Sequence, residues 1–116
     1  FFPHYTIPYK DDKKQGDMSI YDVDGNLITT IPYEQDKAQG IAQGYYPSGA
    51  IKIKSSYSND MLDGKSYEYY SNGNIKKEVV FAEDELHGDY IEYDEDGNIT
   101  RTIIFEHDIL ISDEAY

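Results

Sequence analysis

Two sets of glycines recur along this 116-residue chain with the same period of 24 residues. The first set is Gly16, Gly40, Gly64 and Gly88, and the second is Gly25, Gly49, Gly73 and Gly97. A fixed period of about 20 to 50 residues is typical of repeat proteins, in which each unit buries its apolar face by stacking on its neighbours. The spacing therefore predicts a single repeat domain over residues 1–116.

The repeat divides the domain into units of equal length. There are four full units, with a partial unit before them and a short tail after them: 16–39, 40–63, 64–87 and 88–111, then 1–15 and 112–116. The partial unit is a true copy, because Ile7-Pro8-Tyr9 lies one period before Ile31-Pro32-Tyr33. Since Phe1 is not Met and falls within a unit, we expect the intact protein to carry further N-terminal sequence.

Each unit has the pattern of a β-hairpin. Apolar residues recur at a spacing of two on either side of a short turn that ends in Asp-Gly, Asn-Gly or Ser-Gly, and such turns are a strong hairpin signal. In unit 64–87, a three-residue loop with Gly73 in the left-handed conformation predicts Tyr70 opposite Asn74 and Tyr69 opposite Ile75. The same register predicts Glu68 opposite Lys76 and places Ile75, Val79 and Phe81 at one parity.

The register also predicts a buried face. That face would carry a ladder of rings beside a ladder of aliphatic side chains, namely Tyr21, Tyr45, Tyr69 and Tyr93 beside Leu27, Ile51, Ile75 and Ile99. No helical periodicity of useful length occurs. The predicted fold is therefore all-β, an elongated antiparallel β-meander of about nine or ten strands in a single twisted sheet, built of 24-residue β-hairpin units.

A second turn closes each unit and carries a recurring aspartate: Asp36, Asp60, Asp84 and Asp108. We expect each aspartate to cap the backbone of its own turn, because Asp commonly forms local Asx turns. The glycine that follows is needed where the chain enters the next strand. Leu62, Leu86 and Leu110 precede or follow these turns at equivalent positions and are predicted to point inward.

The core of the unit recurs in residues 45–52 and 69–76, together with Leu62-Asp63-Gly64-Lys65 and Leu86-His87-Gly88-Asp89. These segments resemble the bacterial MORN-repeat variant. Unit 16–39 departs with Pro32 and lacks the Leu before its closing glycine, and Asp60, Asp84 and Asp108 stand where the family commonly has a second turn glycine. The resemblance implies a hairpin array used for protein interaction, and many bacterial relatives are labelled antitoxin or immunity proteins.

Composition limits the partners of this chain. With 10 basic and 23 acidic residues the net charge is −13, which disfavours nucleic acid and anionic membrane surfaces and favours a basic protein partner. The alternative is that the acidity serves solubility and protects sheet edges. No apolar run approaches the roughly 18 residues of a membrane span, so no direct membrane insertion is predicted, and the compartment, whether exported, cell-envelope or cytoplasmic, stays open.

Catalytic and metal-binding motifs are weak. The stretches Asp22-Val23-Asp24-Gly25 and Asp94-Glu95-Asp96-Gly97 resemble part of a calcium loop, but Ile31 and Ile103 stand where the bidentate Glu belongs. The chain has no Cys, its three His are spread over different units, and no hydrolase, phosphate-loop or zinc-protease pattern occurs. We therefore predict a protein that is not an enzyme and that uses no cofactor and no metal.

One constellation favours a binding surface. On the face opposite the tyrosine ladder, the alternation places aromatic and acidic residues in two adjacent rows, with Asp22, Tyr46, Tyr70 and Asp94 in one row and Glu68 and Glu92 in the next. Rings among carboxylates suit a basic protein partner, although sheet propensity alone also explains them. The leading hypothesis is a non-catalytic protein-protein interaction module. The alternative is a structural or cell-envelope spacer that self-associates through its sheet edges, motivated by the apolar segment Ile109-Leu110-Ile111.

Overall fold

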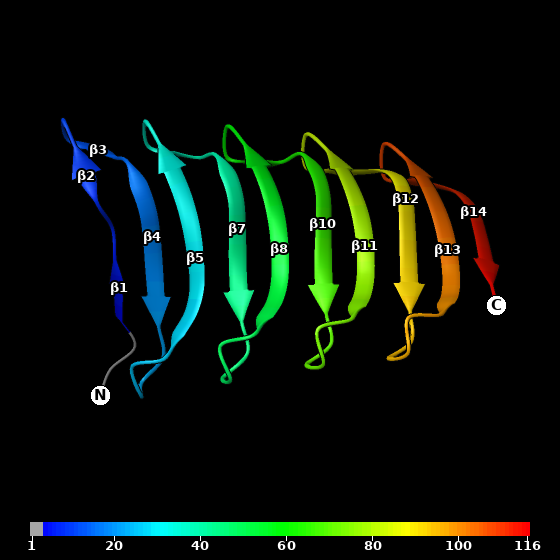
Figure 1. Ribbon diagram of the computed structural model, residues 1–116. Helices are drawn as coiled ribbons and strands as arrows, with labels where there is room; N and C mark the ends of the chain where they lie inside the picture. Colours follow the sequence, from blue (N-terminus) through cyan, green and yellow to red (C-terminus); the bar gives the residue numbers. More distant parts are fainter. Residues whose placement is uncertain (1–3) are drawn as a thin grey trace.

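The computed structural model describes residues 4–116, and all regular elements in that range are β-strands. Four hairpins form the body of the protein (Figure 1): β4 (Gly16–Tyr21) with β5 (Leu27–Glu34), β7 (Gly40–Tyr45) with β8 (Ile51–Ser58), β10 (Gly64–Tyr69) with β11 (Ile75–Ala82), and β12 (Glu85–Tyr93) with β13 (Ile99–Glu106). The outer strands are β1 (His4–Thr6) and β14 (Ile109–Ala115). The shortest strands lie beside the second turns: β2 (Tyr9–Lys10), β3 (Lys13–Lys14), β6 (Lys37–Ala38) and β9 (Met61–Leu62).

The large sheet is an antiparallel meander. Its path is β1-β4-β5-β7-β8-β10-β11-β12-β13-β14, with β6 added to β5 and β9 added to β8, while β2 and β3 pair with each other. The molecule extends over 48 × 31 × 18 Å, which gives the elongated single sheet seen in Figure 1. The predicted fold class, including the estimate of nine or ten meander strands, is confirmed by this ten-strand path.

The first turn of each unit has the predicted three-residue geometry. In unit 64–87 the Tyr70 amide donates to the Asn74 carbonyl at 2.8 Å, and the Gly73 amide donates to the Tyr70 carbonyl at 2.9 Å. Gly73 has a φ of +92°, a left-handed conformation that glycine adopts without strain. Tyr69 pairs with Ile75, and the equivalent pairs of the other three units are Tyr21 with Leu27, Tyr45 with Ile51 and Tyr93 with Ile99, as predicted.

Beyond this pair the predicted register is wrong by one residue. Glu68 pairs with Lys77 rather than Lys76, because a β-bulge inserts Lys76 as an extra residue in β11. A bulge shifts the alternation of the strand after it, so Val79 and Phe81 lie on the face opposite Ile75. The same shift occurs in all four hairpins.

The bulge moves the core to the other side of the sheet. The most buried residues of the hairpins are Ala42, Ser66, Val79 and Ile103, and they lie on the face opposite the tyrosine ladder. We call this side the core face and the other side the tyrosine face. The prediction that the tyrosine ladder forms the buried face is therefore wrong: Tyr21, Tyr45, Tyr69 and Tyr93 are only half-buried. Their hydroxyls need polar partners, which this face supplies, since the Tyr45 hydroxyl donates to Gln43 Oε1 at 3.1 Å.

The aspartates of the second turns bind the neighbouring unit, not their own turn. The Asp60 Oδ1 accepts from the Ala38 amide at 2.6 Å, and the Asp60 amide donates back to the Ala38 carbonyl at 3.0 Å. The other aspartates make the same two-way clamp to a residue 22 positions earlier: Asp36 to Lys14, Asp84 to Leu62 and Asp108 to Leu86. The prediction of a local Asx cap is thus wrong, because stacking places the backbone amide and carbonyl of the preceding second turn within hydrogen-bonding distance of the aspartate.

The second turns adopt a two-residue hairpin form with positive φ at both central positions. The values are +50° and +68° at Asn59 and Asp60, and the other second turns are similar. Gly64 follows with a φ of +104° as the chain enters β10, as expected. Leu62 and Leu86 are half-buried, whereas Leu110, which pairs with Phe105 from the outer strand β14, is 54% exposed.

Candidate functional site

The predicted site residues lie on or next to the core face, at the ends of strands where the first turns begin. Asp22 and Asp94 act as caps of their turns: Asp94 Oδ1 accepts from the Asp96 amide at 3.0 Å and from the Asn98 amide at 2.9 Å. These backbone hydrogen bonds, led by that from Asn98, lower the pKa of the Asp94 carboxyl below its ordinary value. Asp94 is therefore a fixed negative charge at neutral pH.

Tyr46 and Tyr70 reach sideways to the following hairpin. The Tyr46 hydroxyl donates to the Tyr69 carbonyl at 2.5 Å, and the Tyr70 hydroxyl donates to the Tyr93 carbonyl at 2.7 Å. A lysine lies over each ring, with Nζ 5.8 Å from the Tyr70 ring centroid in the case of Lys76. Each ring thus joins two units, so these tyrosines have a structural role whatever they bind.

Glu68 and Glu92 belong to a row of alternating charges across the core face. Lys77 lies between them in the register, and its Nζ is 3.1 Å from Glu68 Oε2 and 5.3 Å from the centre of the Tyr90 ring. Partial burial opposes the charge of Lys77, but the Tyr90 hydroxyl and the Glu68 carboxylate outweigh it and raise the pKa of the ammonium group. Lys77 is therefore charged and directed to Glu68.

The next cation in the row, Arg101, also has a partner. Its guanidinium binds both carboxylate oxygens of Asp113, at 2.8 Å from Nε and 2.5 Å from Nη2. Glu92 lies between Lys77 and Arg101 in the strand register, but these two cations are directed to Glu68 and Asp113. Within residues 4–116, Glu92 is thus the carboxylate of this row with the least direct compensation.

Four of the six predicted residues border one depression of about 530 Å³ at the turn end of the core face. Its lining is Glu68, Tyr70, Lys76, Lys77, Glu92, Tyr93, Asp94 and Thr100. We call it the acidic depression, because Glu68 is paired with Lys77 while Glu92 and Asp94 leave negative charge there. Asp22 and Tyr46 lie in earlier hairpins and do not take part in it. That these six residues bind a partner remains a prediction.

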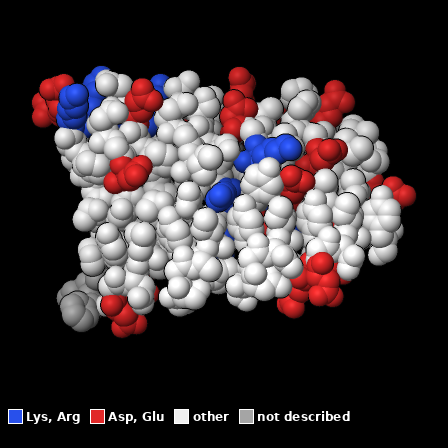
Figure 2. All heavy atoms as spheres, viewed as in Figure 1, with Lys and Arg blue, Asp and Glu red and all other residues white. Residues whose placement is uncertain are grey.

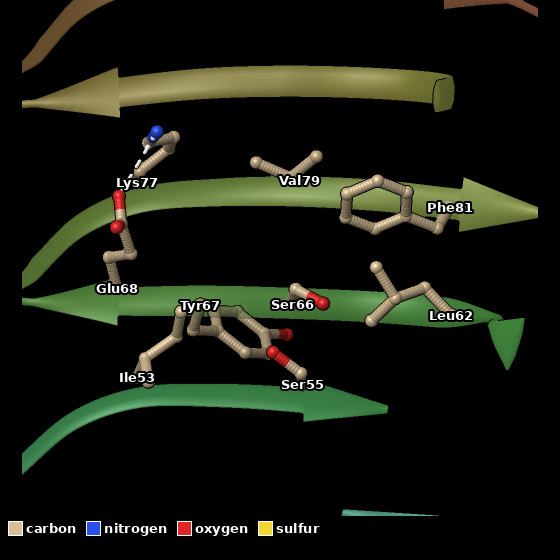
Figure 3. A pocket seen from close by; sticks show the side chains of 9 residues that line it. All are labelled: Ile53, Ser55, Leu62, Ser66, Tyr67, Glu68, Lys77, Val79 and Phe81. Carbon is tan, nitrogen blue, oxygen red and sulfur yellow. Dashed lines mark ion pairs between the residues drawn. The ribbon is translucent and has the colours of Figure 1, made fainter. Parts of the chain in front are cut away.

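A second depression of about 210 Å³ adjoins the first and was missed by sequence reasoning. We call it the apolar groove; its lining is Ile53, Ser55, Leu62, Ser66, Tyr67, Glu68, Lys77, Val79 and Phe81. Figure 3 shows Ser55 and Ser66 between the larger apolar side chains, with the Glu68–Lys77 ion pair at one end. Glu68 and Lys77 border both depressions, so the two lie side by side.

A departure within the repeat could have revealed the groove. The position that holds Ser55 is occupied by Ile31, Val79 and Ile103 in the other units. Across the strand, Ser66 stands where Tyr90 stands one unit later. Small polar residues at these inward positions leave space that the other units fill.

In the view of Figure 2, many Asp and Glu side chains lie along the upper and lower margins of the sheet, and Lys, Arg, Asp and Glu side chains also lie together in its upper central part. Among residues 4–116, no group of three or more potential ligand side chains is arranged to hold a metal ion. The described chain also has no helix with the length and apolar character required to cross a membrane.

These features define a β-hairpin repeat protein with a two-part depression on one sheet face. A family model described as MORN repeat variant matches residues 38–59, 62–83 and 86–107. Because the matched segments cover more than half of the chain, the protein belongs to this family. MORN repeats are generally associated with modules that bind proteins or membranes. No curated protein matches the sequence.

Proposed function

We propose that this protein is a non-catalytic interaction module that binds a basic segment of another protein at the acidic depression. The observation that carries the proposal is the convergence of Glu68, Tyr70, Glu92 and Asp94 on one depression in a chain of net charge −13. Aromatic rings beside carboxylates offer both apolar contact and charge pairing to a Lys or Arg side chain. A basic toxin has this chemistry, and the protein would then act as its antitoxin or immunity protein in a bacterium.

Local geometry supports a basic rather than an acidic partner. Three carboxylates and two lysines line the depression; Lys77 is paired with Glu68, and Lys76 lies over the Tyr70 ring. Glu92 and the fixed charge of Asp94 are left to attract a cation. Such steering acts at a distance of about 10 Å in 0.1 M salt, so binding is expected to weaken as salt rises.

An unbiased peptide-display selection tests this proposal. Recovered sequences should be enriched in Lys and Arg and should bind the wild-type protein in a salt-sensitive manner. Glu92→Gln should weaken their binding about two- to fivefold, the range for one exposed ion pair. Glu34→Gln makes the same charge change at the second-turn end of the inner strand β5 and should have no effect. Recovery of neutral or acidic peptides, or equal effects of the two variants, would contradict the proposal.

A second candidate function, self-association as a spacer, is favoured by one specific surface. Within residues 4–116, β14 pairs only with β13, and its residues Ile109, Leu110 and Ile111 are 65%, 54% and 55% exposed. An exposed apolar edge strand is a template for pairing with a second chain. Sedimentation velocity should then show a concentration-dependent dimer that Ile109→Lys abolishes. A monomer at every concentration argues against this function.

A further inference from the structure

We propose that the apolar groove and the acidic depression form one bipartite site for an extended peptide that carries an apolar side chain and a Lys or Arg two residues apart. This inference rests on the proposed function and specifies its partner motif. The apolar side chain enters the groove beside Ser66, and the basic side chain enters the depression beside Glu92. The Glu68–Lys77 ion pair lies at the boundary between the two parts.

The groove is a built feature, because it interrupts an otherwise continuous apolar row. The register pairs Ala42 with Ser55, Ser66 with Val79, and Tyr90 with both Val79 and Ile103, and β8 lies beside β10, so these residues form one row of the core face. Val79 and Ile103 are 8% and 6% exposed, so this row is the core of the sheet. Ser55 lacks the stabilisation from apolar burial that Ile31, Val79 and Ile103 provide at the same position in the other units. Natural proteins accept such local losses at functional sites.

Ser66 supplies an independent sign of a missing ligand. Its side chain is only 8% exposed, and its Oγ has no hydrogen-bond partner among the described residues. An unpartnered buried hydroxyl is unfavourable, and in native structures such groups call for a ligand or another specific explanation. A peptide backbone seated in the groove would provide the partner after the Ser66 side chain rotates about its Cα–Cβ bond.

The spacing of the motif follows from the rows of the sheet. Ser66 and Glu68 are two residues apart on β10, and residues two apart on an extended strand are about 7 Å apart on one face. A peptide running along the strands therefore places side chains i and i+2 over the groove and over the row of Glu68 and Glu92. Side chains at i and i+1 point to opposite sides and cannot occupy both parts.

Charge selects the identity of the second side chain. Glu68 is already paired with Lys77 at 3.1 Å, so an incoming carboxylate would be repelled by Glu92 and Asp94 and attracted mainly by the single exposed cation Lys76. An incoming Arg or Lys is instead attracted by the carboxylates of Glu92 and Asp94. The partner is thus a protein segment of the apolar-x-basic type, and an apolar-x-acidic segment is rejected.

The test uses fluorescent, end-capped hexapeptides made of Gly and Ser except for two positions. The parent peptide has Leu and Arg two residues apart; three others have Ala for Leu, Gln for Arg, or Leu and Arg adjacent. Fluorescence anisotropy should show the parent binding at least tenfold more tightly than each of the other three. Equal affinity of the parent and the adjacent-pair peptide overturns the proposed geometry.

A groove-filling variant separates this inference from the proposed function. Ser55→Ile restores the residue type of Ile31 and Ile103, so its melting temperature should be equal to or above that of the wild type. It should lose affinity for the parent peptide at least tenfold while binding the peptide with Ala for Leu as the wild type does. Ser71→Ile adds the same side chain at the turn position that holds Val23 and should leave all affinities unchanged.

The outcomes are distinct. If the parent and the peptide with Ala for Leu bind equally, or if Ser55→Ile binds the parent as the wild type does, the bipartite site is wrong while the basic-segment proposal stands. If no Arg-containing peptide binds in a salt-sensitive way, both are wrong. Ser66→Ala gives a further check: it should weaken the parent about three- to tenfold without lowering the melting temperature. A lower melting temperature with unchanged affinity would assign Ser66 to the fold alone.

Discussion

The clamp made by Asp84 gives a quantitative test of how neighbouring units are joined. Its Oδ1 accepts from the Leu62 amide at 2.6 Å, its own amide donates to the Leu62 carbonyl at 2.8 Å, and its φ is +69°. Asp84→Ala removes the side-chain acceptor, at about 1 kcal/mol for an exposed hydrogen bond. Both residues have a Cβ in the left-handed conformation, but alanine lacks the polar group that helps aspartate to tolerate it, at a further cost of up to about 1 kcal/mol. We expect a total loss of about 1–2 kcal/mol.

Two other substitutions separate these terms. Asp84→Gly loses the acceptor but relieves the backbone, and Asp84→Asn keeps an oxygen acceptor and tolerates a left-handed φ. The expected order of stability in urea unfolding is wild type and Asn above Gly, and Gly above Ala. Hydrogen exchange gives the local readout, because the Leu62 amide should lose protection in both Gly and Ala variants. An alanine variant as stable as the glycine variant, or an unchanged Leu62 exchange rate, would refute the reasoning.

Three further outcomes are expected from the first turns. Tyr70→Phe keeps the ring but leaves the Tyr93 carbonyl without its 2.7 Å donor, which should cost about 1 kcal/mol in urea unfolding; an unchanged midpoint contradicts the inter-unit role. Because its pKa is lowered in the folded state, Asp94 should stabilise its turn fully above the ordinary aspartate value of 3.8 and lose that contribution as the pH falls through the lowered pKa; an Asn98 amide signal that does not follow this titration refutes it. Gly73→Ala meets no atom within 4 Å, so its loss of about 1–2 kcal/mol should come from the φ of +92° alone, and an Asn in its place should recover part of it.

The repeat spacing was sufficient to predict the meander, the loop type and the first cross-strand pair of each hairpin. It was not sufficient to locate the bulge, because Lys76 and Lys77 are both lysines and Glu68 can pair with either in a sequence pattern. Only the backbone hydrogen bonds show that Glu68 pairs with Lys77. This pairing shifts the alternation of β11, so the buried face is the one opposite to the predicted face.

The candidate site also has one part that the sequence predicts and another part that it does not. Alternation placed Glu68, Tyr70, Glu92 and Asp94 near one another, and the structure gathers them at one depression. The apolar groove exists because Ser55 replaces the large apolar residue found at this position in the other units. A search for recurring residues does not detect such a replacement. The clamp of the second turns could not be predicted from the sequence around Asp84. The Leu62 amide that binds Asp84 lies 22 positions earlier and becomes its neighbour only when the units stack.

The first turns explain how the same scaffold can vary its surface without losing its fold. In the outer units Asp22 and Asp94 cap the turn from the position where the strand ends. In unit 64–87 this position holds Tyr70, and Asn72 replaces the cap by accepting from the Asn74 amide at 2.8 Å. Unit 40–63 uses Ser48 in the same way. Because the capping oxygen can come from either of two positions, the strand-end position is free to carry a ring, and the two rings fall in the units whose core-face positions include Ser55 and Ser66. The rings and the groove therefore occur together in the middle of the array, where neighbouring hairpins on both sides hold the backbone in place, and the free carboxylates Glu92 and Asp94 border them from the last full unit.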